Sequence, residues 1–254
     1  MLPENMIKRK SYFVKAAIDM IQKSGLESLS ARTVAKAAGF NGASIYTYFQ
    51  NMDHLVALAC VYYIQDYIRD LGERLPKAES WLERDLLIQE MFFKYALKAP
   101  DIYCKVYYPT VNELWVHTLH KEFYEMFPEY YFPEDNFLHE FITLDHKEDN
   151  YQRNMFMLLR AEKEGSIRSG SAPYIYAIHE AIPYHILHRK NVMEQFDLNS
   201  VYRYVLKCML GGIYYYVTAP YQKLLNQKME EYDTIAIMPP SGEEKQPSPE
   251  RVPG

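Results

Sequence analysis

The sequence predicts an all-α protein, and three observations support this prediction. Glycine supplies 10 of the 254 residues, about 4% against an average of about 7%, which is poor material for a turn-rich β-sandwich. Between the proline and glycine breaks, apolar residues recur at the three-and-four spacing of one helix face. No stretch shows the alternation of apolar and polar residues that is typical of a half-buried strand.

The first 60 residues predict four consecutive helices. Apolar residues line one helix face from Phe13 to Ile21, and Gly25 then supplies a left-handed stop. A short second helix over 31–38 and a short third helix over 41–49 precede a longer fourth helix that runs toward Pro76. The caps and stops of these helices are, in order, Gly25, Ser30, Gly39, Asn41 and Asn51.

The second and third helices have the spacing of a helix-turn-helix pair. Two short helices joined by so tight a turn must cross steeply, and this crossing restricts the side chains at the contact. Ala35 is small where the axes approach, Gly39 can take positive φ in the turn, and Ile45 fills the wedge between the helices. The alternative is an ordinary helical hairpin, in which these residue types are also common.

Charge is distributed unevenly along the chain. Residues 1–60 hold seven basic and four acidic side chains, a net charge of +3, whereas the whole chain has a net charge of −5. A basic N-terminal head on an acidic body indicates two roles on one chain, and the head is the candidate for binding an anionic partner.

The head resembles the DNA-binding domain of TetR-type (TetR/AcrR) transcriptional regulators over about residues 7–60. The runs 25–39, 44–49 (Ser-Ile-Tyr-Thr-Tyr-Phe) and 51–55 carry the resemblance. It implies that residues 41–48 form a recognition helix in the major groove. The resemblance and the basic charge together predict DNA contacts from Lys8, Arg9, Lys10, Ser30, Arg32, Asn41, Gly42, Ala43, Ser44, Thr47 and Tyr48.

Individual roles follow from residue chemistry. We expect the Tyr48 hydroxyl to contact a phosphate, and Tyr46 and Phe49 to serve mainly in packing. Gly42 and Met52 stand where the family often has Lys, so phosphate contacts should depend on backbone amides and on an arm formed by residues 8–10. Ala43, Ser44 and Thr47 offer only small base contacts, which favours partial readout through DNA shape.

Residues 61–235 predict a helical effector-binding and dimerisation domain, and residues 236–254 a disordered Pro-rich tail. Ten aromatic residues fall within 101–132, more than a helix pair needs for its core. Such a segment is typical of a small-molecule cavity, although an aromatic core or a subunit contact would use the same residues. The predicted ligand-binding residues are Phe92, Tyr95, Tyr103, Tyr107, Trp115 and His117.

We expect the last two helices, over about 173–190 and 198–217, to form a homodimer. The resemblance implies a four-helix bundle between two subunits, and Gly211 and Gly212 would permit close approach of the partner helix. Pro183 lies inside the first of these helices and is expected to kink it.

Several classes of function lack sequence support. Three widely spaced cysteines form neither a disulfide framework nor a zinc ribbon, and no phosphate loop, nucleophile elbow or metal-binding histidine motif occurs. We therefore expect no enzyme activity, cofactor or metal. No secretory signal or apolar run of membrane-spanning length is visible, which favours a cytoplasmic protein.

The sequence therefore predicts a homodimeric, DNA-binding transcriptional regulator. We interpret it as a repressor released from a palindromic operator by a small, largely apolar or aromatic effector. Two alternatives remain open: a helical metal- or ligand-processing enzyme, and a DNA-binding protein whose body docks another protein.

Overall fold

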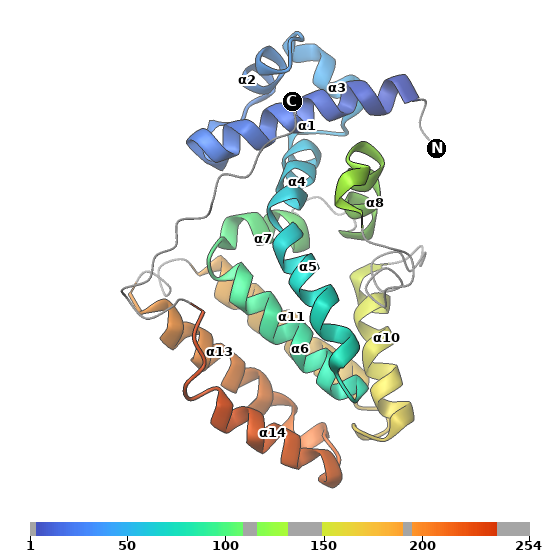
Figure 1. Cartoon of the computed structure of the whole chain (residues 1–254), viewed down its shortest axis with the longest axis vertical. Coiled ribbons are helices and arrows are strands. Elements are labelled where there is room, and N and C mark those ends of the chain that lie inside the picture. Colours follow the sequence, from blue (N-terminus) through green and yellow to red (C-terminus); the bar gives the residue numbers. More distant parts are fainter. Residues whose placement is uncertain (1–3, 109–115, 132–148, 190–194, 238–254) are drawn as a thin grey trace.

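The computed structural model describes residues 4–108, 116–131, 149–189 and 195–237, without the side chains of 116–117 and 149–154. These residues are almost entirely helical, as the sequence predicts, apart from turns and one isolated bridge between Ile167 and Val217. The head lies at one end of the molecule, and α4 runs from it into the body (Figure 1). None of the described helices is long and apolar enough to cross a membrane.

The head follows the predicted order of helices. It contains α1 (Glu4–Ser24), α2 (Ala31–Ala37) and α3 (Ile45–Tyr48), and short 3-10 turns at Leu26–Ser28 and Gly42–Ser44 precede α2 and α3. The predicted glycine stops are confirmed, since Gly25 and Gly39 have φ angles of 77° and 81°. The predicted caps are also confirmed, because the side chains of Ser30, Asn41 and Asn51 accept backbone N–H groups of the helices that follow them.

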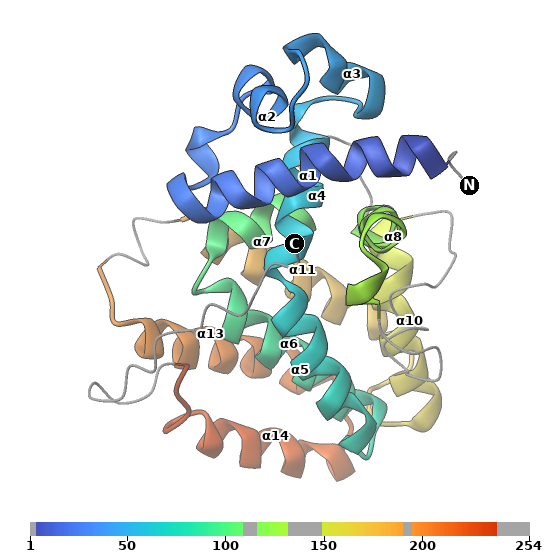
Figure 2. The same cartoon turned by 45° about the horizontal axis from the view of Figure 1, so that its top comes forward.

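The predicted long fourth helix is two helices. α4 (Met52–Tyr63) ends before Ile64, and α5 (Gln65–Arg74) continues in nearly the same direction (Figures 1 and 2). At the break, the Val61 carbonyl accepts the Ile64 backbone N–H at 3.4 Å and the side-chain Nε2 of buried Gln65 at 2.8 Å. In a continuous helix the backbone N–H of Gln65 would occupy that carbonyl.

The body packs seven described helices around the α4–α5 axis. A further 3-10 turn at Leu75–Lys77 leads into them. The helices are α6 (Trp81–Ala96), α7 (Pro100–Tyr107), α8 (Val116–Met126), α10 (Asp149–Glu164), α11 (Ala172–His188), α13 (Leu198–Ile213) and α14 (Ala219–Glu231).

The C-terminal part of the chain departs from the sequence prediction. α14 follows α13, where the sequence predicts no further helix. Only Leu225 of α14 is buried, so its apolar stripe is too short to be a clear signal. The chain also stays packed beyond the predicted tail boundary at 236, since the backbone N–H of Ile237 donates to Asn199 Oδ1 at 2.8 Å. The remainder of the predicted tail lies outside the described residues.

Pro183 does not end α11, which runs from Ala172 to His188. Proline has no N–H, so the His179 carbonyl cannot accept the usual bond from residue 183. Packing offsets this loss, because Pro183 is buried in the body.

Candidate nucleic-acid interface

The predicted recognition helix spans a 3-10 turn and α3. The Asn41 side-chain oxygen accepts the Ser44 backbone N–H at 3.1 Å, which starts the turn. Ile45 and Phe49 are buried against the head, whereas Ala43, Tyr46 and Thr47 are exposed. The outer face of the helix therefore carries short and aromatic side chains.

Tyr46 is wrongly predicted as a packing residue. Its side chain is 61% exposed, whereas Phe49, the other residue predicted to pack, is buried. Helical periodicity was the signal that the sequence analysis missed, because residues 43, 46 and 47 share one face, opposite Ile45 and Phe49. Tyr46 is therefore an additional candidate for DNA contact.

Residues 8–10 lie within α1 and do not form a free arm. Lys8 and Arg9 are exposed, as a phosphate contact requires. A hydrogen bond to the Tyr48 side chain raises the pKa of Arg9 above its ordinary value. Arg9 donates in this bond, so the Tyr48 hydroxyl keeps its own proton for an outside acceptor.

Lys10 faces inward, contrary to the expectation of an exposed phosphate contact. Its side chain is 4% exposed, and its ammonium pairs with Glu122 of α8. Its Nζ also lies 4.9 Å from the centre of the Phe49 ring. Burial lowers the pKa of Lys10 to about 8. We therefore remove Lys10 from the candidate DNA contacts.

Glu122 also binds His54, a buried residue in the first turn of α4. His54 Nε2 donates to Glu122 at 2.7 Å, and His54 Nδ1 accepts the backbone N–H of Gln50 at 3.3 Å. Burial and the nearby Lys10 charge lower the pKa of His54 to about 4, so the ring is neutral at pH 7. Glu122 thus contacts the residues that hold the end of α3. Because Glu122 and His54 are 68 positions apart, no local signal could predict this contact.

The remaining predicted DNA-contact residues lie at the starts of α2 and the recognition helix. Ser30 and Arg32 are exposed, and Ser30 forms a reciprocal cap with Thr33. Asn41 is exposed, and Gly42 is half-buried against the Arg32 backbone. The Ser44 hydroxyl donates to Asn41 at 3.0 Å, so it is an acceptor toward DNA rather than a free donor.

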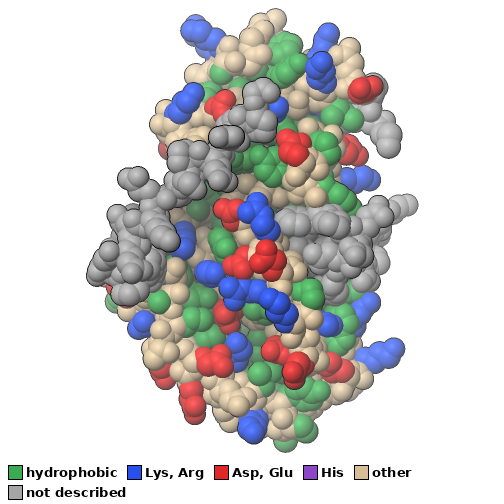
Figure 3. Space-filling view, in the orientation of Figure 1, with side chains coloured by type: hydrophobic (Ala, Val, Ile, Leu, Met, Phe, Trp, Pro, Cys, Tyr) green, Lys and Arg blue, Asp and Glu red, His purple; other side chains and the backbone are tan. Residues whose placement is uncertain are grey.

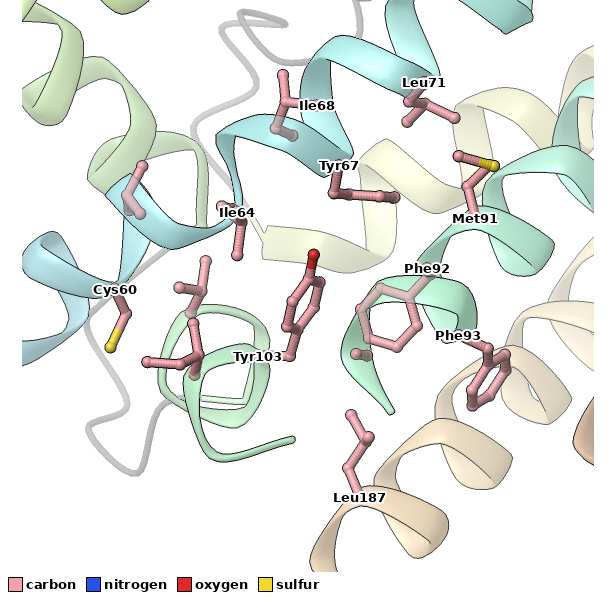
Figure 4. Packing of buried hydrophobic residues seen from close by; sticks show 14 of the residues in the cluster. Cys60, Ile64, Tyr67, Ile68, Leu71, Met91, Phe92, Phe93, Tyr103 and Leu187 are labelled. Atoms are coloured by element: carbon pink, nitrogen blue, oxygen red, sulfur yellow. The ribbon is translucent and has the colours of Figure 1, made fainter. Parts of the chain in front are cut away.

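Three of the predicted ligand-binding residues meet in one aromatic cluster. Phe92 of α6 and Tyr103 and Tyr107 of α7 contact one another and Tyr67 of α5, with ring centres 5.3–6.4 Å apart. Figure 4 shows Tyr103 and Phe92 facing each other, with Tyr67 on one side and Leu187 of α11 on the other. We call Tyr67, Phe92, Tyr103 and Tyr107 the aromatic cluster.

Tyr95, also predicted to bind the ligand, borders the aromatic cluster, since its ring centre lies 5.9 Å from that of Tyr67. Its hydroxyl donates to Asp70 at 3.0 Å, and the same carboxylate accepts Arg74 and Lys94. Acidic and basic side chains are interspersed over the middle of the face of the molecule that Figure 3 shows. Tyr95 therefore lies between the aromatic cluster and a charge network on the surface. Trp115 and the side chain of His117 lie outside the described residues.

An apolar surface runs over α11 and α13. A cavity of about 460 Å³ opens there and is lined by Ile186, Phe196, Ser200, Val201 and Tyr204. Gly212 does not serve a partner helix, because a Cβ there would lie 3.1 Å from Ile178 of the same chain. Gly211 faces open space. Large exposed aromatic side chains also occur along α11, α13 and the segments next to α13: Tyr174, Tyr184, Phe196, Tyr204, Tyr214 and Tyr215.

The described residues include no group of three or more His, Cys, Asp or Glu side chains that could hold a metal ion. The three cysteines are free, and burial raises the pKa of the Cys60 thiol to about 12, which suppresses thiolate formation.

Comparison with known proteins locates the likeness in the head. Residues 13–59 match the family "Bacterial regulatory proteins, tetR family". The nicotine-responsive transcriptional repressor HdnoR of Paenarthrobacter nicotinovorans is 32% identical over 74 residues, which are 29% of this chain and 38% of that repressor.

Solved structures of regulators align with most of this chain at low identity and modest structural similarity. The transcriptional regulator FadR from Bacillus subtilis, in complex with stearoyl-CoA, is 16% identical with a TM-score of 0.47, over 80% of this chain and 98% of FadR. A putative TetR-family transcriptional regulator from Mesorhizobium loti is 11% identical with a TM-score of 0.46, over 85% of this chain and 100% of the other.

Proposed function

We propose that this chain, whose residues 13–59 match the tetR family of bacterial regulatory proteins, is a sequence-specific transcriptional repressor that binds a palindromic operator through α3. The observation that carries this proposal is the outer face of the recognition helix. Ala43, Tyr46 and Thr47 are exposed there, and Arg9 and Tyr48 are joined by a hydrogen bond beside them. Short side chains that can contact base edges, flanked by side chains that can donate hydrogen bonds to phosphates, are suited to binding in the major groove.

The direct test is operator binding at increasing salt. Footprinting on the DNA upstream of the protein's own gene identifies the site, and fluorescence anisotropy then measures affinity. We expect affinity to fall steeply with salt and half-sites to lie about 34–36 Å apart. Affinity that stays flat from low to high salt would contradict electrostatic binding by the head.

Two variants separate phosphate contact from base reading. Tyr48→Phe removes the free hydroxyl and should weaken binding to all sequences equally, whereas Thr47→Ala should relax the preference at one base step. Tyr131→Phe is the matched control, because this exposed tyrosine lies beyond α8, outside the head and outside the α11–α13 surface. Equal loss in all three variants would refute the assigned roles.

We propose that a small, largely apolar or aromatic effector binds the body and releases the operator. The name of the related repressor states a response to nicotine, a small organic molecule. Two body helices reach the head: α8 through Glu122, and α7 through Lys105, which pairs with Asp53 of α4 at 3.2 Å. Movement of α8 or α7 would therefore reorient α4 and the end of α3.

The effector switch has a thermodynamic test. A ligand that favours the released state must bind less tightly when operator is bound, by the same factor by which it weakens operator binding. Coupling of about 1–3 kcal/mol corresponds to roughly 5- to 150-fold. Equal effector affinity with and without saturating operator would refute the switch.

We propose a homodimer through α11 and α13. Support comes from the exposed aromatic side chains and the apolar cavity on this surface, which a second copy would cover. Light scattering should give the mass of a dimer. Tyr204→Ser should weaken it, whereas Tyr46→Ser, at a similarly exposed tyrosine in the head, should not. A monomer at concentrations that bind DNA would contradict the proposal.

A further inference from the structure

A pair of buried ionisable side chains lies where α6 meets α11. Asp85 and His179 are 5% and 6% exposed, and His179 Nδ1 lies 3.6 Å from Asp85 Oδ1. The Gln89 side-chain amide, one turn along α6 from Asp85, lies 3.4 Å from the same ring nitrogen. We call Asp85, Gln89 and His179 the polar node.

Two atoms of the polar node have no hydrogen-bond partner. They are Asp85 Oδ2 and His179 Nε2, and the hydroxyl of the buried Tyr103 in the aromatic cluster also has none. Because Nδ1 accepts the Gln89 amide, Nε2 carries the proton of the neutral ring and is an unused donor. Leaving such groups buried and unpaired is destabilising, because each has lost its hydrogen bonds to water.

Three other buried polar side chains of the described residues have hydrogen-bond partners. Gln65 bonds to Val61 and Tyr124, His54 bonds to Glu122 and Gln50, and the Tyr202 hydroxyl donates to the Glu90 carbonyl.

No described cation offsets Asp85. The neighbouring Arg84 guanidinium lies over the Trp81 ring at 4.6 Å, and Arg160 lies over the same ring and Phe156. Burial alone raises the pKa of Asp85 to about 8 and lowers that of His179 to about 3. Both groups are neutral at pH 7, so the site lacks a positive partner for the carboxyl group.

The polar node and the aromatic cluster lie along one face of α6. Asp85 and Phe92 are seven residues apart, which is two helical turns and about 10 Å along the axis. Phe92 contacts Tyr103, whose hydroxyl is the third unpaired atom. A ligand that reaches both ends needs one polar group and an apolar body about 10 Å long.

We propose that Asp85 and His179 are the polar anchor of the effector site, and that the effector is an organic amine, protonated in water, with an apolar or aromatic body. That the ligand acts as an effector rests on the proposed function, whereas the binding of an amine at Asp85 does not. The ammonium group pairs with Asp85, which releases its proton to the solvent, and His179 Nε2–H donates to an acceptor on the ligand or to the ionised carboxylate. The apolar body lies against the aromatic cluster.

The test compares a charged probe with its uncharged counterpart on the full chain. Phenylbutylamine and phenylbutanol have the same apolar body and differ in the polar end. By isothermal titration calorimetry we expect the amine to bind at least about ten-fold more tightly, because only the amine supplies the missing charge. Binding of both probes with equal affinity, or of neither, overturns the proposal.

Variants assign the preference to Asp85. Asp85→Asn keeps the shape of a side chain that is already neutral, and it should abolish the preference for the amine. Asp66→Asn, at an exposed position on α5, is the matched control and should retain it. An unchanged preference in Asp85→Asn overturns the proposal.

A measurement on the unaltered protein covers the case in which Asp85→Asn does not fold. Ionisation of Asp85 on binding releases about one proton, so the binding heat at pH 7 should differ between phosphate and Tris buffers. Equal heats in the two buffers overturn the proposal.

Operator affinity then separates this inference from the proposed function. If the amine binds through Asp85 but leaves operator affinity unchanged, Asp85 is confirmed as the anchor of the ligand and the effector switch is refuted. If other molecules release the operator equally from the wild-type protein and from Asp85→Asn, the effector switch is confirmed and the role of Asp85 as its anchor is refuted.

Discussion

Replacing Glu122 by Gln removes one negative charge from the contact between α8 and the head. Glu122 pairs with the buried Lys10 ammonium and accepts the His54 ring N–H at 2.7 Å. Gln keeps the size of the side chain and can still accept from His54. The variant therefore tests the charge rather than the packing.

The cost of this change follows from the two contacts. Removing one partner of a buried ion pair can cost about 3–5 kcal/mol when the remaining side chain stays charged. Lys10 can instead become neutral, because its pKa is already lowered to about 8. Losing its proton at pH 7 costs the native state only about 1.4 kcal/mol. Weakening the charge-assisted bond from His54 adds about 1 kcal/mol. We expect a total loss of about 2–3 kcal/mol in the free energy of unfolding.

Urea unfolding at fixed protein concentration and pH 7 measures this loss. The midpoint should fall without a change in slope, and the double variant Lys10→Met with Glu122→Gln should recover most of the stability. Glu73→Gln, the same substitution at an exposed position of α5, away from Lys10, should change stability by no more than about 0.5 kcal/mol. A loss in Glu122→Gln as small as that of the control would show that Lys10 does not depend on Glu122.

Three further predictions concern DNA affinity and pH dependence. Gly42→Lys should strengthen operator binding and steepen its salt dependence by about one charge, since a Cβ at 42 meets Arg32 backbone atoms only at 3.7 Å or more; anisotropy in a salt series with an unchanged slope would count against it. Tyr46→Ala should preserve stability, because the side chain is 61% exposed, and weaken operator binding by about 1–3 kcal/mol; full affinity would return Tyr46 to a structural role. The native pKa of Asp85, about 8, lies above its unfolded value of 3.8, so the native state binds the extra proton and stability should decrease as pH rises from 6.5 to 8, by up to about 1.4 kcal/mol per unit; urea titrations should show this decrease reduced in Asp85→Asn, and identical pH profiles would refute a protonated Asp85.

The DNA-binding head was predictable because short-range signals determine it. Ser30, Asn41 and Asn51 each accept a backbone N–H three residues ahead, and Gly25 and Gly39 take positive φ within their own turns. Such contacts need no distant partner, so the helices and their ends could be predicted from a few adjacent residues. The aromatic cluster was partly predictable for a related reason, since an excess of aromatic residues in one segment indicates where rings will meet.

The contacts that decide what each side chain can do were set by the tertiary structure. Lys10 has the same local sequence context as the exposed Lys8 and Arg9, yet Glu122 buries it from another helix. Asp85 and His179 come from α6 and α11 and have no common local pattern. Helix formation depends on neighbours within a few residues, whereas burial and ionisation depend on whatever side chain the fold brings within about 4 Å, and only packing determines that neighbour.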